Sequence, residues 1–110
     1  LLDLHNLHVN ATNHRFSADE FVDELDLANV VEIHVAGGND VAGMYTDSHA
    51  GACPEAVWRL LEYVVPRASR LSGVTFEYHE SYFVRLGEPG LRAELGRARE
   101  IFPQRVAACP

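Results

Sequence analysis

The chain has 110 residues, enough for a single domain, and its 47% hydrophobic content is ordinary for a globular protein. Its formal charge is −7, from 16 acidic and 9 basic residues, and every basic residue is arginine. This balance excludes the basic surface that nucleic acids and anionic membranes need, so we expect neither as a partner, and no apolar run approaches the roughly 20 residues of a membrane helix.

Two features of the sequence concern its context. It begins at Leu1, inside what reads as a strand, so we expect a piece cut from a longer polypeptide. Its two cysteines, Cys53 and Cys109, are too few for a disulfide framework, and no secretory signal pattern is visible. We therefore expect a reducing, cytoplasmic location.

The N-terminal part predicts a strand, a loop and a helix. Leu1 to Leu4 read as the strand. The stretch after it is rich in Asn and His, and we predict a loop because it is too polar for a core and too short for a helix. The tetrapeptide that begins at Ser17 matches a capping box, which predicts a helix from about Ala18 to Leu25.

The central part predicts a buried strand followed by a polar loop. Val30 to Ala36 is β-branched and nearly continuous in apolar character, and its exceptions, Glu32 and His34, share one face of a strand. In a barrel that face would be the lumen. Asp47 and His49 follow across a loop that contains three glycines.

The C-terminal part predicts helix, strand and helix. Apolar residues at helical spacing indicate a helix from about Pro54 to Ala68, which Pro66 should kink or end. Val74 to Tyr78 reads as a third strand, and Pro89 to Ile101 as a third helix. Residues 103–110 are predicted to be a loose tail.

Strands alternating with helices predict an α/β fold with parallel strands and right-handed crossovers. Three strands with helices on one side would leave two free sheet edges and one uncovered face. Either the unit assembles with something else, or it is the last three βα units of a TIM (β/α)8 barrel. We predict the second, with residues 1–102 as the C-terminal part of a metal-dependent barrel domain.

Six residues with metal-binding side chains lie at or just after the predicted strand ends, where βα barrels carry their chemistry. They are Asp3, Asn6, His34, Asp47, His49 and Glu77. Mixed imidazole and carboxylate donors without a thiolate suit iron, manganese or zinc in a catalytic site. Carboxylates can also bridge two ions, so a multinuclear centre is consistent with this set.

Each of these residues also has a structural interpretation. His34 could be a hydrogen-bonded core residue, and Asp47 and His49 could be turn residues. Asp3 and Glu77 could accept backbone N–H groups at strand ends, with Asn6 as a turn former. Their expected convergence on one rim favours the metal site. No nucleophile elbow or phosphate-binding glycine loop is present, which excludes the corresponding hydrolase and nucleotide-binding motifs.

The motifs LLDLHN, Asn13-His14, VVEIHVAG and TDSHAG resemble the C-terminal part of the multinuclear non-heme iron-dependent oxidases, the TIM-barrel family that includes the methanobactin-biosynthesis B protein. The resemblance implies two or three iron ions and dioxygen-dependent modification of cysteines in ribosomal precursor peptides, commonly with a partner protein that recognises the peptide. It also implies that the same six residues are ligands. His5, His14 and His79 would then support the ligands or line the substrate pocket, although family members often have Asn at the position of His5.

Two other functions fit the same scaffold. One is a divalent-metal sugar isomerase or an endonuclease-like barrel, in which the ions polarise a carbonyl or activate water. The other is a non-catalytic, truncated half-barrel. Because related proteins draw further ligands from earlier strands, we expect the 110 residues alone to be inactive and the full-length protein to be the enzyme.

Overall fold

The computed structural model describes residues 1–103, and the predicted tail beyond Pro103, including Cys109, lies outside the described residues. The strands are β1 (Leu2–Asp3), β2 (Glu32–Ala36), β3 (Asn39–Val41), β4 (Met44–Thr46) and β5 (Gly73–Glu77). The α-helices are α1 (Leu4–His14), α2 (Ala18–Asp23), α3 (Glu55–Val64) and α4 (Phe83–Ile101). Short 3-10 turns are η1 (Leu27–Asn29), η2 (Val65–Arg67) and η3 (Glu80–Tyr82).

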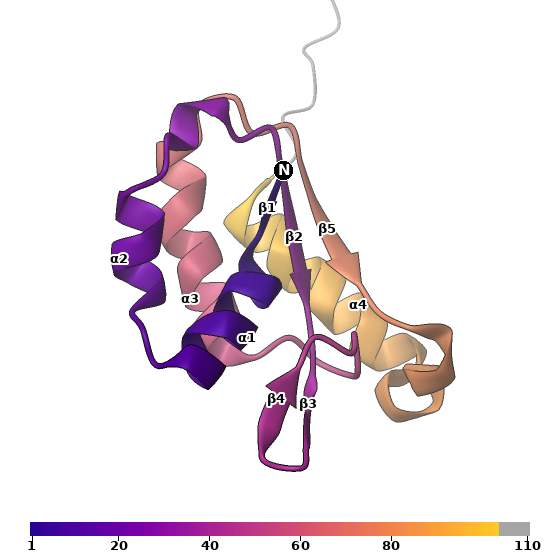
Figure 1. Ribbon diagram of the computed structural model, residues 1–110. Coiled ribbons are helices and arrows are strands. Elements are labelled where there is room, and N and C mark those ends of the chain that lie inside the picture. The colour runs from indigo at the N-terminus through magenta and orange to yellow at the C-terminus, as the bar shows by residue number, and fades with distance from the viewer. Residues whose placement is uncertain (104–110) are drawn as a thin grey trace, which may run out of the picture.

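The main sheet has the order β1-β2-β5, and both of its pairings are parallel. This confirms the predicted mixed α/β class with parallel strands. Within residues 1–103 no further strand pairs with the outer edges of β1 and β5. The three strands run in one direction and end beside the hairpin formed by β3 and β4 (Figure 1).

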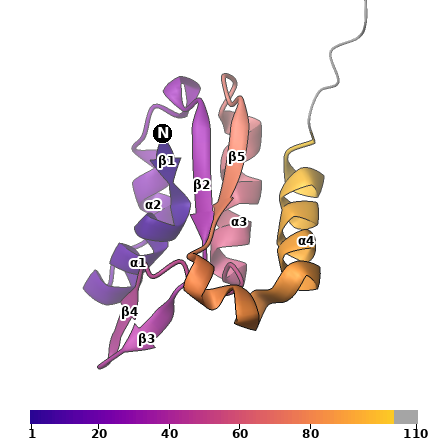
Figure 2. The same cartoon turned by 90° about the vertical axis from the view of Figure 1, so that its right-hand side faces the viewer.

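The two faces of the sheet differ in polarity. Ile33 and Val35 of β2 are fully buried in the core, which they share with Trp58 and Leu61 of α3. Figure 2 shows α3 and α4 together on one side of the sheet. The opposite face of β2 carries His34 and stays partly exposed, so helices cover one face and polar side chains occupy the other.

The stretch after Leu4 corrects the predicted loop, because residues Leu4–His14 form helix α1. Asp3 caps the helix by accepting the N–H of Asn6 at 2.8 Å. Leu4, Leu7 and Ala11 are buried, a spacing that places them on one side of a helix. The polar His and Asn residues concealed this pattern in the sequence.

The glycine-containing segment after β2 also differs from prediction, because it is not a loop throughout. Asn39–Val41 and Met44–Thr46 pair as an antiparallel hairpin with Ala42 and Gly43 between them. Both turn residues have positive φ, 51° and 83°, as a type I′ turn requires. Alanine is uncommon in that conformation. Because the turn has Ala-Gly in place of the usual Asn-Gly, no clear signal for a hairpin was visible in the sequence.

The other predicted elements are confirmed within a few residues. Ser17 caps α2 by accepting the N–H of Glu20 at 3.2 Å, as the capping box predicted. Helix α3 ends at Val64, and the 3-10 turn that follows contains Pro66. Helix α4 begins earlier than predicted, at Phe83, but Gly87 interrupts it with φ 65° and ψ 171°.

Candidate metal centre

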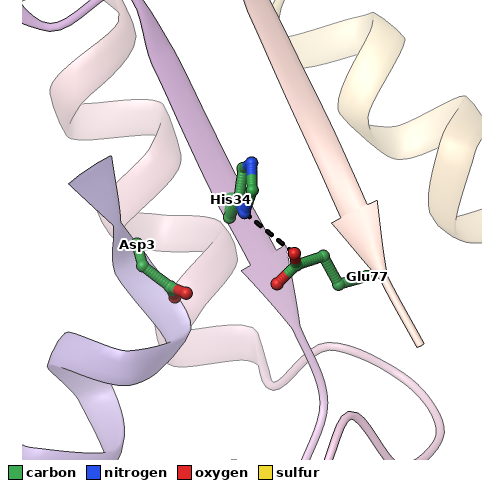
Figure 3. Close-up of side chains that lie close together, drawn as sticks. All are labelled: Asp3, His34 and Glu77. Atoms are coloured by element: carbon green, nitrogen blue, oxygen red, sulfur yellow. Dashed lines mark ion pairs between the residues drawn. The ribbon is translucent and has the colours of Figure 1, made fainter. Parts of the chain in front are cut away.

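The sheet brings three of the predicted ligands together. Asp3 lies opposite His34 in the pairing of β1 with β2, and Glu77 ends β5 opposite Ala36. One ligand atom from each of Asp3, His34 and Glu77 lies within 4.8 Å of the others. In Figure 3 the two carboxylates point toward each other beside the His34 ring. Nδ1 of His34 lies 2.9 Å from Oε1 of Glu77.

The start of α1 contributes the fourth predicted ligand. The backbone N–H of Asn6 donates to Asp3, so the helix cap fixes Asn6 next to the sheet. Its side-chain Nδ2 donates to Oδ2 of Asp47 at 3.3 Å. Asn6 therefore links the strand-borne carboxylate of Asp3 to the loop that follows the hairpin.

That loop carries the last two predicted ligands, Asp47 and His49. Nε2 of His49 lies 3.3 Å from Oδ1 of Asp47 and 3.5 Å from Oε2 of Glu77. His49 has a left-handed backbone, with φ 56°, which is uncommon outside glycine. Such conformations cost free energy and often occur at functional sites. The six predicted ligands thus form one connected cluster.

Close backbone packing holds this loop against the end of β2. The N–H of Ala50 donates to the carbonyl of Gly37 at 3.1 Å. A Cβ at Gly37 would lie 2.4 Å from the carbonyl oxygen of Ala52, a distance that real contacts do not show. A glycine at this position therefore allows the chain to bring Asp47 and His49 beside the sheet.

His5, predicted to support the ligands, lies fully buried beneath Asp47. Its Nδ1 is 2.7 Å from Oδ1 of Asp47, and its Nε2 is 3.0 Å from the hydroxyl of Tyr45. Burial opposes ionisation of Asp47, but the hydrogen bonds from His5 and Asn6 outweigh it and hold the pKa of Asp47 below its ordinary value. His5 and Asn6 therefore hold Asp47 in place as an ionised carboxylate.

Asn13 has a structural role that sequence reasoning missed. Its side chain donates to the carbonyl of Tyr45 at 2.7 Å and accepts the N–H of Tyr45 at 3.0 Å. This pair of hydrogen bonds fastens β4 to α1 in the way a neighbouring strand would. The Asn13-His14 motif was visible in the sequence, but its contact with the hairpin depends on the tertiary fold.

The other two predicted supporting residues lie further out. His14 is exposed in the last turn of α1, about 12 Å along the helix axis from Asn6. His79 is also exposed, and its backbone N–H donates to the carbonyl of His49 at 2.9 Å. The structure thus places His79 at the edge of the cluster and does not bring His14 into it.

The donor set of the cluster fits a hard or borderline metal ion. It offers carboxylates and imidazoles without a thiolate, since the sulfur of Cys53 is buried elsewhere in the core. Ligands around one ion sit about 2.0–2.2 Å from it and therefore at most about 4.4 Å from one another. The ligand atoms of Asp3, His34 and Glu77 lie within 4.8 Å of one another, so small side-chain movements would bring them around one ion. Glu77 faces His34 with one oxygen and His49 with the other.

Comparison with known proteins gives matches along the chain. Residues 1–102 match the family described as the RiPP precursor modification enzyme MbnB/TglH/ChrH, where RiPP denotes a ribosomally made, post-translationally modified peptide. A UPF0276 protein of Anaeromyxobacter sp. strain Fw109-5 is 31% identical over 111 residues, which cover 100% of this chain and 39% of that protein.

Two further relatives carry the same UPF0276 designation. The protein of Streptomyces avermitilis is 37% identical over 103 residues, covering 91% of this chain and 20% of the relative. That of Bordetella pertussis is 44% identical over 70 residues, covering 59% of this chain and 24% of the relative. The chain therefore spans well under half the length of these relatives.

Proposed function

This chain belongs to the MbnB/TglH/ChrH family of RiPP precursor modification enzymes, and on that basis we propose that the protein carrying it is a non-heme iron-dependent oxidase that modifies cysteine residues of a ribosomally made precursor peptide. The observation that supports a metal-dependent reaction is the group formed by Asp3, His34 and Glu77 on three parallel strands, with Asp47 and His49 beside it on the loop after the hairpin. We further propose that residues 1–102 form the last three βα units of a TIM barrel. The polar face of the sheet would then be part of the lumen.

The residues divide into two groups, and the ligand atoms of the strand-borne group are close enough together for one ion. Asp3 and His34 lie on the sheet, and Asp47 and His49 lie on the loop after the hairpin. Glu77 lies between the groups, with one oxygen toward each. Glu77 would serve both groups if the centre holds more than one ion. Iron bound here would supply the dioxygen chemistry that oxidation of a peptide requires.

The protein side chains would prepare the site in two ways. The sheet fixes Asp3, His34 and Glu77 through backbone pairing, so their relative positions need little adjustment on metal binding. The loop-borne Asp47 is held by His5 and Asn6. In the proposed barrel these side chains would lie at the mouth formed by the strand ends, where a peptide would reach them. A separate peptide-recognising protein remains part of the proposal.

The experiment that tests this function measures metal content and peptide mass together. The protein carrying this sequence is expressed with iron and analysed for bound metal, beside its His34→Ala and Asp47→Ala variants. We expect iron in the wild type and loss of iron in both variants. His14→Ala is the matched control, because His14 is an exposed histidine of the same chain that lies outside the cluster, and it should retain its iron.

The reaction is then followed by mass spectrometry of a cysteine-containing precursor peptide, with and without dioxygen. The proposal expects a mass change that requires both iron and dioxygen. Full iron occupancy in His34→Ala and Asp47→Ala would remove the metal assignment. Activity with a redox-inert metal in the absence of dioxygen would favour the isomerase or endonuclease-like chemistry instead.

A further inference from the structure

The His34 ring lies between two carboxylates, and only one of them belongs to the metal cluster. Nδ1 lies 2.9 Å from Glu77, on the side where Asp3 is also found. Nε2 lies 3.3 Å from Oε1 of Glu32. Glu32 starts β2 and shares with His34 the face of the strand that the helices leave open. Its side chain is 44% exposed.

Glu32 is itself held in place by the neighbouring strand. Oγ1 of Thr75 donates to the same oxygen, Oε1, at 2.7 Å. Thr75 is the residue of β5 that lies directly opposite His34 in the parallel register. The position of the Glu32 carboxylate relative to the His34 ring therefore follows from strand pairing. Three residues on two paired strands form a unit that we call the Glu32 clamp: Glu32, Thr75 and His34.

Proton counting shows what the clamp does when an ion is present. A neutral imidazole has one N–H and one lone pair. His34 would bind an ion shared with Asp3 and Glu77 through the lone pair of Nδ1, because Nδ1 is the ring nitrogen that faces Glu77. The remaining proton is then on Nε2, and the acceptor within hydrogen-bond distance there is Glu32. Metal-bound histidines typically donate their second N–H to a carboxylate, which fixes the tautomer and the ring orientation.

We propose that Glu32 is a positioning residue that holds the Nε2–H of His34, so that His34 binds the metal through Nδ1. This inference rests on the proposed metal centre and adds to it a residue outside the six ligands. Thr75 acts indirectly, because its hydroxyl positions the Glu32 carboxylate, which in turn positions the His34 ring.

A competing assignment makes Glu32 a ligand, and substitutions separate the two. Glutamine keeps an oxygen that can accept Nε2–H but loses the negative charge that a ligand would supply. Glu32→Gln should therefore retain most of the metal affinity if Glu32 positions His34. Glu32→Ala removes the acceptor and should weaken binding about 10- to 100-fold, the usual effect of losing such a partner. Thr75→Val should give a smaller loss.

The test uses zinc as a diamagnetic probe in the protein carrying this sequence. Zinc affinity is measured by chelator competition, and ¹⁵N-histidine NMR detects the Nε2–H of His34, assigned by its disappearance in His34→Gln. We expect a slowly exchanging Nε2–H in the wild type and in Glu32→Gln. In Glu32→Ala the signal should exchange rapidly with water. Glu62→Ala, an exposed glutamate of α3, is the control and should match the wild type.

The outcomes distinguish this inference from the proposed function. If Glu32→Ala kept the wild-type affinity and a protected Nε2–H, the positioning role would be overturned while the metal centre stood. If Glu32→Gln lost binding as severely as Glu32→Ala, Glu32 would be a ligand instead. If the wild type bound neither zinc nor iron, the metal centre itself would be overturned, and the role of Glu32 with it.

Discussion

The buried imidazole of His5 is hydrogen-bonded to the carboxylate of Asp47, with 2.7 Å between Nδ1 and Oδ1. His5 lies in the first turn of α1, and Asp47 follows the hairpin 42 positions later in the chain. Because an ionised carboxylate only accepts, Nδ1 carries a proton, and in the neutral ring Nε2 then accepts from the Tyr45 hydroxyl. This connection fixes the loop-borne half of the candidate site to the core.

Tyr45→Phe tests that connection. Loss of the hydroxyl leaves Nε2 of the fully buried His5 without its partner, so we expect the free energy of unfolding to fall by about 1 to 3 kcal/mol. Urea unfolding followed by circular dichroism measures the change. Tyr82→Phe alters a tyrosine of the η3 turn and should have a smaller effect. Equal stability of the two variants would contradict the hydrogen-bonded arrangement.

Asp47→Asn tests the pH dependence that follows from the lowered pKa of Asp47. The folded-state pKa lies below the ordinary value of 3.8, so this carboxylate stabilises the folded metal-free protein above that pH. The stabilisation is lost as the pH falls through the folded-state pKa. Urea unfolding between pH 3 and pH 7 should therefore show a steeper acid loss in the wild type than in Asp47→Asn. If the stability of both proteins changed with pH in the same way, Asp47 would not contribute this pH-dependent stabilisation.

Two substitutions at Asp3 separate its helix-capping role from its proposed metal role. Asp3→Ala removes both the cap of α1 and the carboxylate, so it should lose metal and about 0.5 to 2 kcal/mol of stability. Asp3→Ser keeps a capping oxygen and should lose only the metal. Metal analysis together with thermal unfolding of the two variants measures this difference. Wild-type metal content in Asp3→Ser would exclude Asp3 as a ligand.

Two glycines of α4 should respond to alanine in opposite directions. Gly87 has φ 65° and ψ 171°, a conformation almost restricted to glycine, so Gly87→Ala should destabilise the protein by about 1 to 3 kcal/mol. Gly96 lies in the regular part of the helix, with no atom within 4 Å of an added Cβ. Gly96→Ala should stabilise by roughly 0.5 to 1 kcal/mol. Thermal unfolding of both variants checks the signs.

Asn13→Ala should loosen the hairpin without unfolding the domain. The variant removes both hydrogen bonds that Asn13 makes with the backbone of Tyr45. We expect faster amide hydrogen exchange at Tyr45 and unchanged exchange in the core strand β2. Asn29→Ala is the control, because the side chain of Asn29 bonds to Asp26 in a distant turn. Unchanged exchange at Tyr45 would contradict the fastening role of Asn13.

The elements that could be predicted are those whose own hydrophobic pattern shows which side chains are buried. The run from Val30 to Ala36 predicted a buried strand with His34 on its polar side, and both features are present. Helix α1 was missed because His and Asn have low helix propensity, while the cap at Asp3 and the spacing of Leu4 and Leu7 were the available signals.

The residues of the candidate site could be predicted from the sequence, but most of the contacts between them could not. Strand ends indicated where Asp3, His34 and Glu77 would meet, because parallel strands end at one edge of a sheet. A supporting role was predicted for His5, but its partners could not be read from the sequence, since its contacts with Asp47 and Tyr45 join positions some 40 residues apart. The Glu32 clamp likewise depends on the register between β2 and β5.

The hairpin is attached at its base and free at its tip. Val41 and Met44 at the tip are exposed, whereas Tyr45 beside them is fastened to α1. Substitutions or loop exchange at the tip should therefore leave the predicted ligands Asp47 and His49 in place. A library randomised at Val41 and Met44 would vary the outer surface of the hairpin and leave the geometry of the candidate site unchanged.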